Sequence, residues 1–133
     1  MGADSVTYLL DTHAVLWLLE GNTRLGRQAL KAIKDSPAGE LAICDLTLLE
    51  IAMLGKKGAI SLLPSAGYVL DHVAEKFVVI PISPQIAAEA VSIPLPHKDP
   101  FDRVITATAR IHDLTLITRD RRIVQSKSVA TLW

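Results

Sequence analysis

The sequence feature that most constrains the fold is the alternation of short aliphatic runs with longer amphipathic segments. Runs of Val, Ile and Leu that stop at polar or turn residues are typical of buried strands in a parallel sheet. The segments between the runs carry apolar residues at helical spacing. This alternation favours an α/β fold in which helices cover both faces of a mainly parallel sheet of four to five strands. The candidate strands are residues 6–10, 41–44, 78–81, 114–118 and 129–132.

The predicted helices fill the segments between these strands. Their ends coincide with Gly, Ser and Pro residues, which commonly mark helix boundaries. Asp99 is a suitable N-cap and Pro100 suits the first helical position, so residues 100–112 are predicted to form a helix with Asp102 in its first turn. The other predicted helices are residues 14–19, 25–33, 45–54, 65–76 and 84–91.

The composition fits an aliphatic core, because half of the 133 residues are apolar and only 5% are aromatic. A chain of this length is expected to form one domain, over residues 1–133. Fourteen basic and fourteen acidic residues cancel, so any nucleic-acid binding must come from local patches. Cys44 is the only cysteine, which excludes a disulfide framework and a thiolate zinc site. The sequence has no export signal and no apolar run long enough for a membrane span, so we expect a cytoplasmic protein without membrane contacts.

Four acids are expected to meet at one edge of the sheet. Asp11 and Asp120 follow predicted strands, and Glu50 and Asp102 lie near the starts of predicted helices. Ligands bind outside the carboxyl ends of the strands in such sheets. Two carboxylates about 4 Å apart repel by about 4 kcal/mol at an effective dielectric of 20, so the cluster needs a cation or shared protons. Oxygen ligands favour Mg²⁺ or Mn²⁺, which predicts metal-assisted hydrolysis of a phosphodiester.

Each helical acid also has a purely structural interpretation. An acid three residues after an N-cap often only completes the cap, and Asp99 with Asp102 fits that pattern. Thr47 and Glu50 likewise have the spacing of a capping box, unless the helix begins at Asp45. The sequence leaves both interpretations open.

Four segments resemble, in order, the motifs of PIN-domain ribonucleases, and most closely the VapC-like toxins of bacterial toxin–antitoxin pairs. They are residues 8–17, 49–52, 97–109 and 116–120. Four ordered motifs that span essentially the whole chain are far more specific than any one of them. The resemblance implies a PIN-like three-layer sandwich and a metal-dependent endoribonuclease. By this resemblance the catalytic and metal-binding residues are Asp11, Glu50, Asp102 and Asp120, and their polar neighbours are Thr12, Asp99 and Thr118.

The same resemblance implies three partners. They are an RNA substrate, a second copy of the chain in a homodimer, and an antitoxin whose C-terminal segment blocks the acidic groove. Arg103 and Arg119 adjoin expected site acids, so we expect them on a rim that binds RNA phosphates. Trp17 lies in an apolar helical stripe and is expected in the core or a dimer contact rather than in a base-stacking platform.

Two other functions fit an α/β domain of this size. A phosphoacceptor receiver domain also gathers acids and Mg²⁺ at one sheet edge, but it needs an aspartate after a central strand and a lysine after a late one. Here the central candidate is Glu50, inside a helix, and Arg119 follows the late strand. The second alternative is a PIN domain that binds without catalysis, and the presence of all four acids argues against it.

Overall fold

The structure, a computed structural model, describes residues 5–133, so residues 1–4 of the predicted domain lie outside it. Its centre is a five-stranded sheet in the order β3-β2-β1-β4-β5. Each neighbouring pair is parallel, as the alternation of aliphatic runs predicted. The strands are β1 (Tyr8–Leu10), β2 (Leu41–Cys44), β3 (Val78–Ile80), β4 (Thr115–Ile117) and β5 (Thr131–Leu132).

The helices lie where helical spacing placed them, with boundaries shifted by a few residues. They are α1 (Thr12–Glu20), α2 (Arg27–Asp35), α3 (Asp45–Lys56), α4 (Ala66–Lys76), α5 (Pro84–Ser92) and α6 (Pro100–Ile111). The short helix α7 (Arg121–Ser126) and a 3₁₀ turn (Ala38–Glu40) were not predicted. Six residues are too few for an apolar period to show, so the sequence of α7 indicated only a polar turn. None of the helices in residues 5–133 is long and apolar enough to cross a bilayer.

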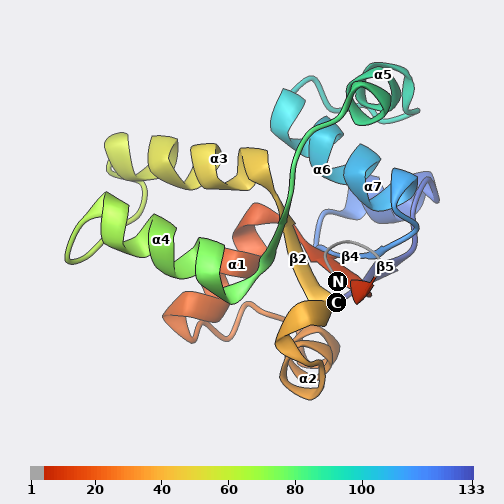
Figure 1. Cartoon of the computed structure of the whole chain (residues 1–133). Helices are drawn as coiled ribbons and strands as arrows, with labels where there is room; N and C mark the ends of the chain where they lie inside the picture. The colour runs from red at the N-terminus through yellow and green to blue at the C-terminus, as the bar shows by residue number, and fades with distance from the viewer. Residues whose placement is uncertain (1–4) are drawn as a thin grey trace.

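The sheet is the middle of three layers (Figure 1). Alternate strand residues point to opposite faces, so Leu9 and Leu116 belong to one core cluster and Leu10 and Ile117 to the other. Helices α5, α6 and α7 cover the first face, and helices α1 to α4 cover the second. The predicted α/β class, the parallel sheet and the helices on both faces are confirmed.

The strand order creates a crevice between β1 and β4. From the central strand β1 the chain first builds outward through β2 and β3, and later returns to place β4 and β5 on the other side. Ligands of open α/β sheets bind where the strand order reverses in this way. Asp11 directly follows β1, and its backbone N–H donates to the carbonyl of Ile117 at the end of β4, 3.1 Å away. The ends of these two strands therefore bring their following residues together.

Helix α6 is held rigidly against the sheet. Its residues 104–109 are all buried. The hydroxyls of Thr106 and Thr108 are satisfied by carbonyls of the helix itself, at 2.8 Å and 2.7 Å. Its first turn is capped by Asp99, whose carboxylate accepts from the N–H of Phe101 at 2.8 Å. The position of Asp102 is thus fixed by the buried helix that follows it.

Candidate active site

Asp11 joins β1 to α1 and is the N-cap of that helix. Its carboxylate accepts a hydrogen bond from the N–H of Ala14 at 2.8 Å. Desolvation by the surrounding protein raises the pKa of Asp11, and hydrogen bonds from Thr118 and Ala14 only partly offset this effect. The carboxylate is therefore held at one point although its charge is poorly solvated there.

Asp102 occupies the first turn of α6, as predicted. Among residues 5–133 its carboxylate accepts no hydrogen bond, so it does not complete a capping box with Asp99. Desolvation raises the pKa of Asp102, and the charges of Asp99, Glu50 and Asp120 raise it further. An acid with raised pKa and free oxygens is suited to accept a cation.

Glu50 lies in α3, and the structure excludes the capping-box interpretation. The helix begins at Asp45 with Cys44 as its N-cap, so Thr47 and Glu50 are not a capping box. The Glu50 carboxylate instead accepts a hydrogen bond from the buried Thr12 hydroxyl at the start of α1. Desolvation raises the pKa of Glu50, with contributions from the charges of Asp99 and Asp11.

Asp120 is held by both oxygens of its carboxylate. One oxygen caps α7 by accepting from the N–H groups of Arg122 at 2.9 Å and Ile123 at 3.4 Å. The other lies 2.7 Å from Nε2 of His97. Desolvation opposes ionisation, but the hydrogen bonds from His97 and the helix N-terminus outweigh it and lower the pKa of Asp120. Thr118 accepts from the Asp120 N–H at 3.1 Å and so links this turn to Asp11.

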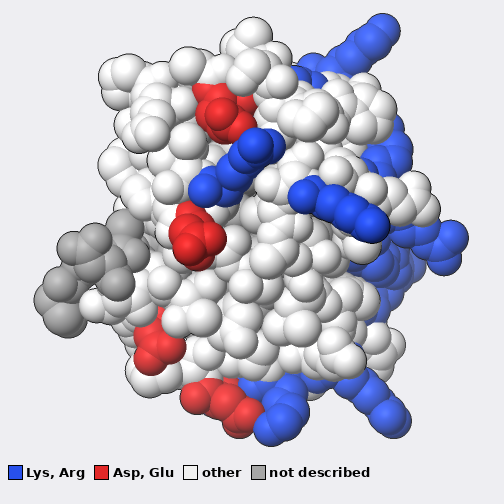
Figure 2. Space-filling model, turned by 90° about the vertical axis from the view of Figure 1, so that its right-hand side faces the viewer, with Lys and Arg blue, Asp and Glu red and all other residues white. Residues whose placement is uncertain are grey.

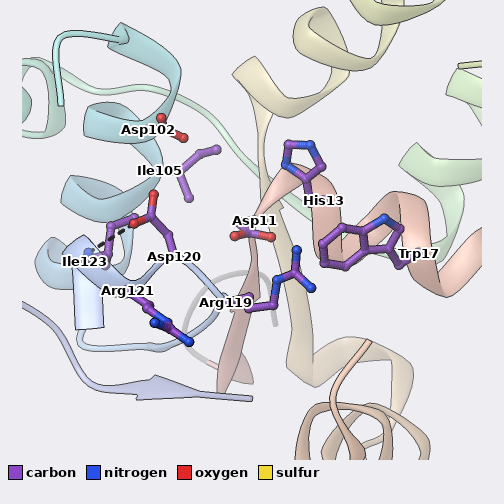
Figure 3. Close-up of a pocket in the computed structure, with 9 residues that line it drawn as sticks. All are labelled: Asp11, His13, Trp17, Asp102, Ile105, Arg119, Asp120, Arg121 and Ile123. Atoms are coloured by element: carbon purple, nitrogen blue, oxygen red, sulfur yellow. Dashed lines mark hydrogen bonds between the residues drawn. The ribbon is translucent and has the colours of Figure 1, made fainter. Parts of the chain in front are cut away.

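Three of the four acids line one open pocket of about 650 Å³. In Figure 3 the carboxylates of Asp11, Asp102 and Asp120 come from three different elements and border the same space. Ligand atoms of His97, Asp102 and Asp120 lie within 4.8 Å of one another. Glu50 is not part of the pocket lining, although its charge is felt by Asp102. The other lining residues are His13, Trp17, Ile105, Arg119, Arg121 and Ile123.

Arg119 lies on the pocket wall opposite Asp102 and Asp120 (Figure 3). Its guanidinium stacks on the ring of Trp17, 4.7 Å from the ring centroid. Trp17 also contacts the rings of His13 and Trp133, with centroids 5.5 Å and 5.8 Å away. The placement of Arg119 agrees with a phosphate-binding rim. Trp17 packs partly on the core as expected, but it also forms part of the pocket, which the sequence did not predict.

The prediction that Arg103 belongs to the rim is not supported by its placement. All three nitrogens of its guanidinium donate to backbone carbonyls, so the group is already engaged inside the protein. Its position next to Asp102 in the sequence suggested the rim, but successive residues on a helix point in different directions. The accepting carbonyls belong to Ala90, Val91, Ile93, Leu95 and His97.

His97 contacts the site acid Asp120, a role that the sequence did not predict. The sequence places its four histidines apart, without ligand spacing. The available signal was the alternation of Ile93, Leu95 and His97 with the prolines Pro94 and Pro96. In the structure the first three residues are buried and the two prolines are exposed. That alternation directs the His97 side chain inward, and the residue as a whole is only 3% exposed.

The charged groups form no broad field on the face shown in Figure 2. On that face many Lys and Arg side chains gather along the right-hand edge and others lie across the middle and at the lower end, while Asp and Glu side chains form separate small patches. This distribution agrees with the zero formal net charge. Recognition of a charged ligand must therefore depend on the local pocket and its rim.

Both the sequence and the fold of this chain match known proteins. The sequence profile of the PIN domain matches residues 8–127. The chain is 37% identical over 118 residues to ribonuclease VapC22 of Mycobacterium tuberculosis, covering 88% of this chain and 89% of that protein. A toxin–antitoxin complex from Klebsiella pneumoniae contains a chain with 28% identity and a TM-score of 0.68, over 94% of this chain and 97% of that one. DNA-bound VapBC from Salmonella typhimurium shares the fold at 16% identity with a TM-score of 0.71, over 96% and 97% of the two chains.

Proposed function

This chain belongs to the PIN domain family, and we propose that it is a divalent-metal-dependent endoribonuclease that acts as the toxin of a toxin–antitoxin pair. The observation that carries the proposal is the shared pocket of Asp11, Asp102 and Asp120, with Glu50 beside it. The relative with 37% identity is a ribonuclease, and its alignment covers most of both chains. A receiver domain is not favoured, because Glu50 lies within α3 rather than at the end of a strand.

The donor groups of the pocket fit a hard divalent cation. Desolvation and mutual repulsion raise the pKa values of Asp11, Glu50 and Asp102, so a positive charge among them would relieve an unfavourable arrangement. Carboxylate oxygens suit Mg²⁺ or Mn²⁺ better than zinc. We assign Asp11 and Asp102 as the principal ligands, with Glu50 and Asp120 completing the site.

The protein groups around the cluster have separate tasks. A bound cation would supply a water of lowered pKa and stabilise the charge on the leaving oxygen. Thr12 fixes the Glu50 carboxylate by donating to it, and a carboxylate held there would supply negative charge for the cation and a proton acceptor for the reaction. Thr118 orients Asp11 and Asp120 together. Arg119 is placed to bind a phosphate of the substrate, and Trp17 supports its guanidinium from behind.

The substrate we propose is single-stranded or loop RNA. The pocket is open to solvent on one side, and the wall formed by Arg119 and Trp17 offers one cation and aromatic surface. Flexible strands can bend a phosphodiester into such a pocket, which a stiff duplex cannot do. Action on RNA would place the protein in the cytoplasm.

The antitoxin we propose covers the same pocket. The Klebsiella pneumoniae relative was solved as a toxin–antitoxin complex. A basic side chain of the antitoxin could neutralise the acids in place of the cation. A second copy of the chain is also proposed as a partner, because Leu49, Met53 and Val91 leave apolar surface exposed on α3 and α5.

The experiment that tests the function is cleavage of a labelled single-stranded RNA. We expect cleavage in Mn²⁺ or Mg²⁺ and none in excess EDTA. The Asp11→Asn variant, purified in the same way, controls for contaminating nucleases and should be inactive. Cleavage that persists in EDTA, or that the variant retains, would contradict the proposed mechanism.

A further inference from the structure

The connection between α5 and α6 contains a buried histidine that the proposed reaction does not use. The side chain of His97 is 1% exposed, and its Nε2 lies 2.7 Å from Oδ2 of Asp120. Its other nitrogen, Nδ1, is buried and has no hydrogen-bond partner within residues 5–133. Burying an unsatisfied polar atom destabilises a fold, and an apolar side chain would avoid this cost. Within residues 5–133, the only polar contact of the ring is therefore the one it makes with Asp120.

The backbone of His97 is held in place by a hydrogen bond from Arg103. Nη1 of Arg103 donates to the carbonyl of His97 and to the carbonyl of Leu95, each at 2.9 Å. Nε of Arg103 donates to the carbonyl of Ala90, near the end of α5, at 2.7 Å. Nη2 donates to the carbonyls of Val91 at 3.1 Å and Ile93 at 2.7 Å. The prolines at positions 94 and 96 have no N–H group, so this segment is poor in backbone donors. Arg103 supplies the missing donors with one planar group.

Arg103 and His97 connect two acids of the pocket. Arg103 follows Asp102 directly on α6, whereas Asp120 lies on the turn between β4 and α7. The path runs from the first turn of α6, through Arg103, to the His97 carbonyl and then through the imidazole to Asp120.

We propose that Arg103 and His97 are positioning residues that hold the Asp120 carboxylate at a fixed place relative to Asp102. This inference rests on the proposed metal-dependent function, since it assigns a task within that site. Neither residue is among those that line the pocket. Groups that orient metal ligands in this way affect metal affinity or activity by 10- to 100-fold, by general experience of metal sites.

The decisive variant is His97→Leu, measured by titration of Mn²⁺ and by melting in EDTA. We expect Mn²⁺ affinity to fall by about tenfold. The melting curve in EDTA checks that the variant folds, because loss of the hydrogen bond to Asp120 and removal of the unsatisfied Nδ1 change stability in opposite senses. His97→Gln can still donate to Asp120 and should recover most of the affinity. Loss of a purely structural histidine would leave Mn²⁺ affinity unchanged.

A double-mutant cycle separates positioning from direct ligation. If His97 acts through Asp120, His97→Leu should have no further effect on Mn²⁺ affinity in the Asp120→Asn background. An effect that persists there would overturn the proposal and make His97 a ligand itself. Arg103→Lys replaces the planar guanidinium and its several directed donors with one ammonium group, so it should also lower Mn²⁺ affinity. Arg110→Lys, on the same helix but paired with Glu89 at 3.2 Å, is the matched control and should not change it.

The outcomes distinguish this proposal from the proposed function. Equal Mn²⁺ affinity in wild type and His97→Leu would overturn the positioning role and leave the metal-dependent function intact. A wild-type protein that binds no Mn²⁺ would overturn both.

Discussion

Asp102 and Glu50 differ in how the protein surrounds their carboxylates. Asp102 accepts no hydrogen bond within residues 5–133, whereas Glu50 accepts one from Thr12. Both have raised pKa values because the protein desolvates them and other acids lie near. In the absence of a cation each ionised carboxylate therefore destabilises the folded state, and each can be tested by removing its charge without changing its shape.

For Asp102→Asn we expect loss of RNA cleavage together with a melting temperature in EDTA that equals or exceeds that of the wild type. The substitution removes one charge from a repelling cluster and leaves the Asp99 cap of α6 in place. Cleavage in Mn²⁺ and thermal melts in EDTA give the two readings. Asp71→Asn, on the exposed surface of α4, is the control that should change neither. An unfolded Asp102→Asn protein would show that Asp102 is structural.

For Glu50→Gln we expect an intact melting curve and a cleavage rate lower by at least about 10², the range for loss of an acid-base group. Gln can keep the hydrogen bond from Thr12 but cannot take a proton or attract a cation. The measurement is single-turnover cleavage at saturating Mn²⁺, with the exposed Glu75→Gln as control. Full activity of the variant would leave a site of three aspartates.

At the scale of elements, the pocket wall depends on how α2 is docked. Gly26 is the N-cap of α2, and a Cβ there would lie 2.7 Å from the carbonyl oxygen of Trp133. That carbonyl accepts from the N–H of Ala29, and the Trp133 ring packs edge-on against Trp17. The close approach of α2 to Trp133 therefore supports the aromatic group behind Arg119.

Gly26→Ala should lower stability by about 1–3 kcal/mol, the usual cost of overpacking. The Cβ would lie 2.6 Å from Cδ1 of the Trp133 ring and 2.7 Å and 2.8 Å from the Trp133 carbonyl oxygen and carbon, and these backbone atoms cannot move aside as a flexible side chain can. Thermal and urea melts measure the loss, and tryptophan fluorescence reports a shift of Trp133 and Trp17. Gly39→Ala meets open space and is the matched control. Equal melting temperatures for Gly26→Ala and wild type would contradict this packing.

At the scale of the whole molecule, the acidic cluster couples stability to protons and cations. Asp11, Glu50 and Asp102 have raised pKa values in the folded state, so the fold binds protons more tightly than the unfolded chain does. Their contribution favours folding at low pH and is lost as pH rises through the raised values. Asp120 acts in the opposite sense. Because its pKa is lowered in the folded state, its contribution to stability is present above the ordinary carboxyl range and is lost only as pH falls below that range.

We therefore expect the three raised carboxyls to increase the melting temperature in EDTA as pH falls from neutral toward the ordinary carboxyl range. At neutral pH, Mn²⁺ should stabilise the protein by about 2.7 kcal/mol at 100 times its dissociation constant. Asp102→Asn should show a shallower pH dependence and a smaller Mn²⁺ effect. A melting temperature that falls on mild acidification, with no Mn²⁺ effect at neutral pH, would show that the acids are not a coupled cluster.

The sequence by itself determined the order of elements and the side of the sheet on which the site lies. Aliphatic runs such as 41–44 and the helical spacing after Asp99 are local patterns, set by the burial of one strand or one helix face. Because parallel strands end at the same edge, the acids that follow them could be placed together before the fold was known. The ordered motifs added the identity of the family and agreed with the same four acids.

Tertiary structure decided the partners of individual side chains. The start of α3 at Asp45, and with it the contact of Glu50 with Thr12, depends on how two distant segments pack. Arg103 lies beside Asp102 in the sequence, yet it turns inward because five carbonyls of a neighbouring segment need donors. His97 contacts the carboxylate of Asp120, which lies 23 residues later in the sequence. Hydrogen bonds of this kind join residues far apart in the chain, so no local period or spacing reveals them, and only the packed fold determines which side chains bind a ligand and which hold the site together.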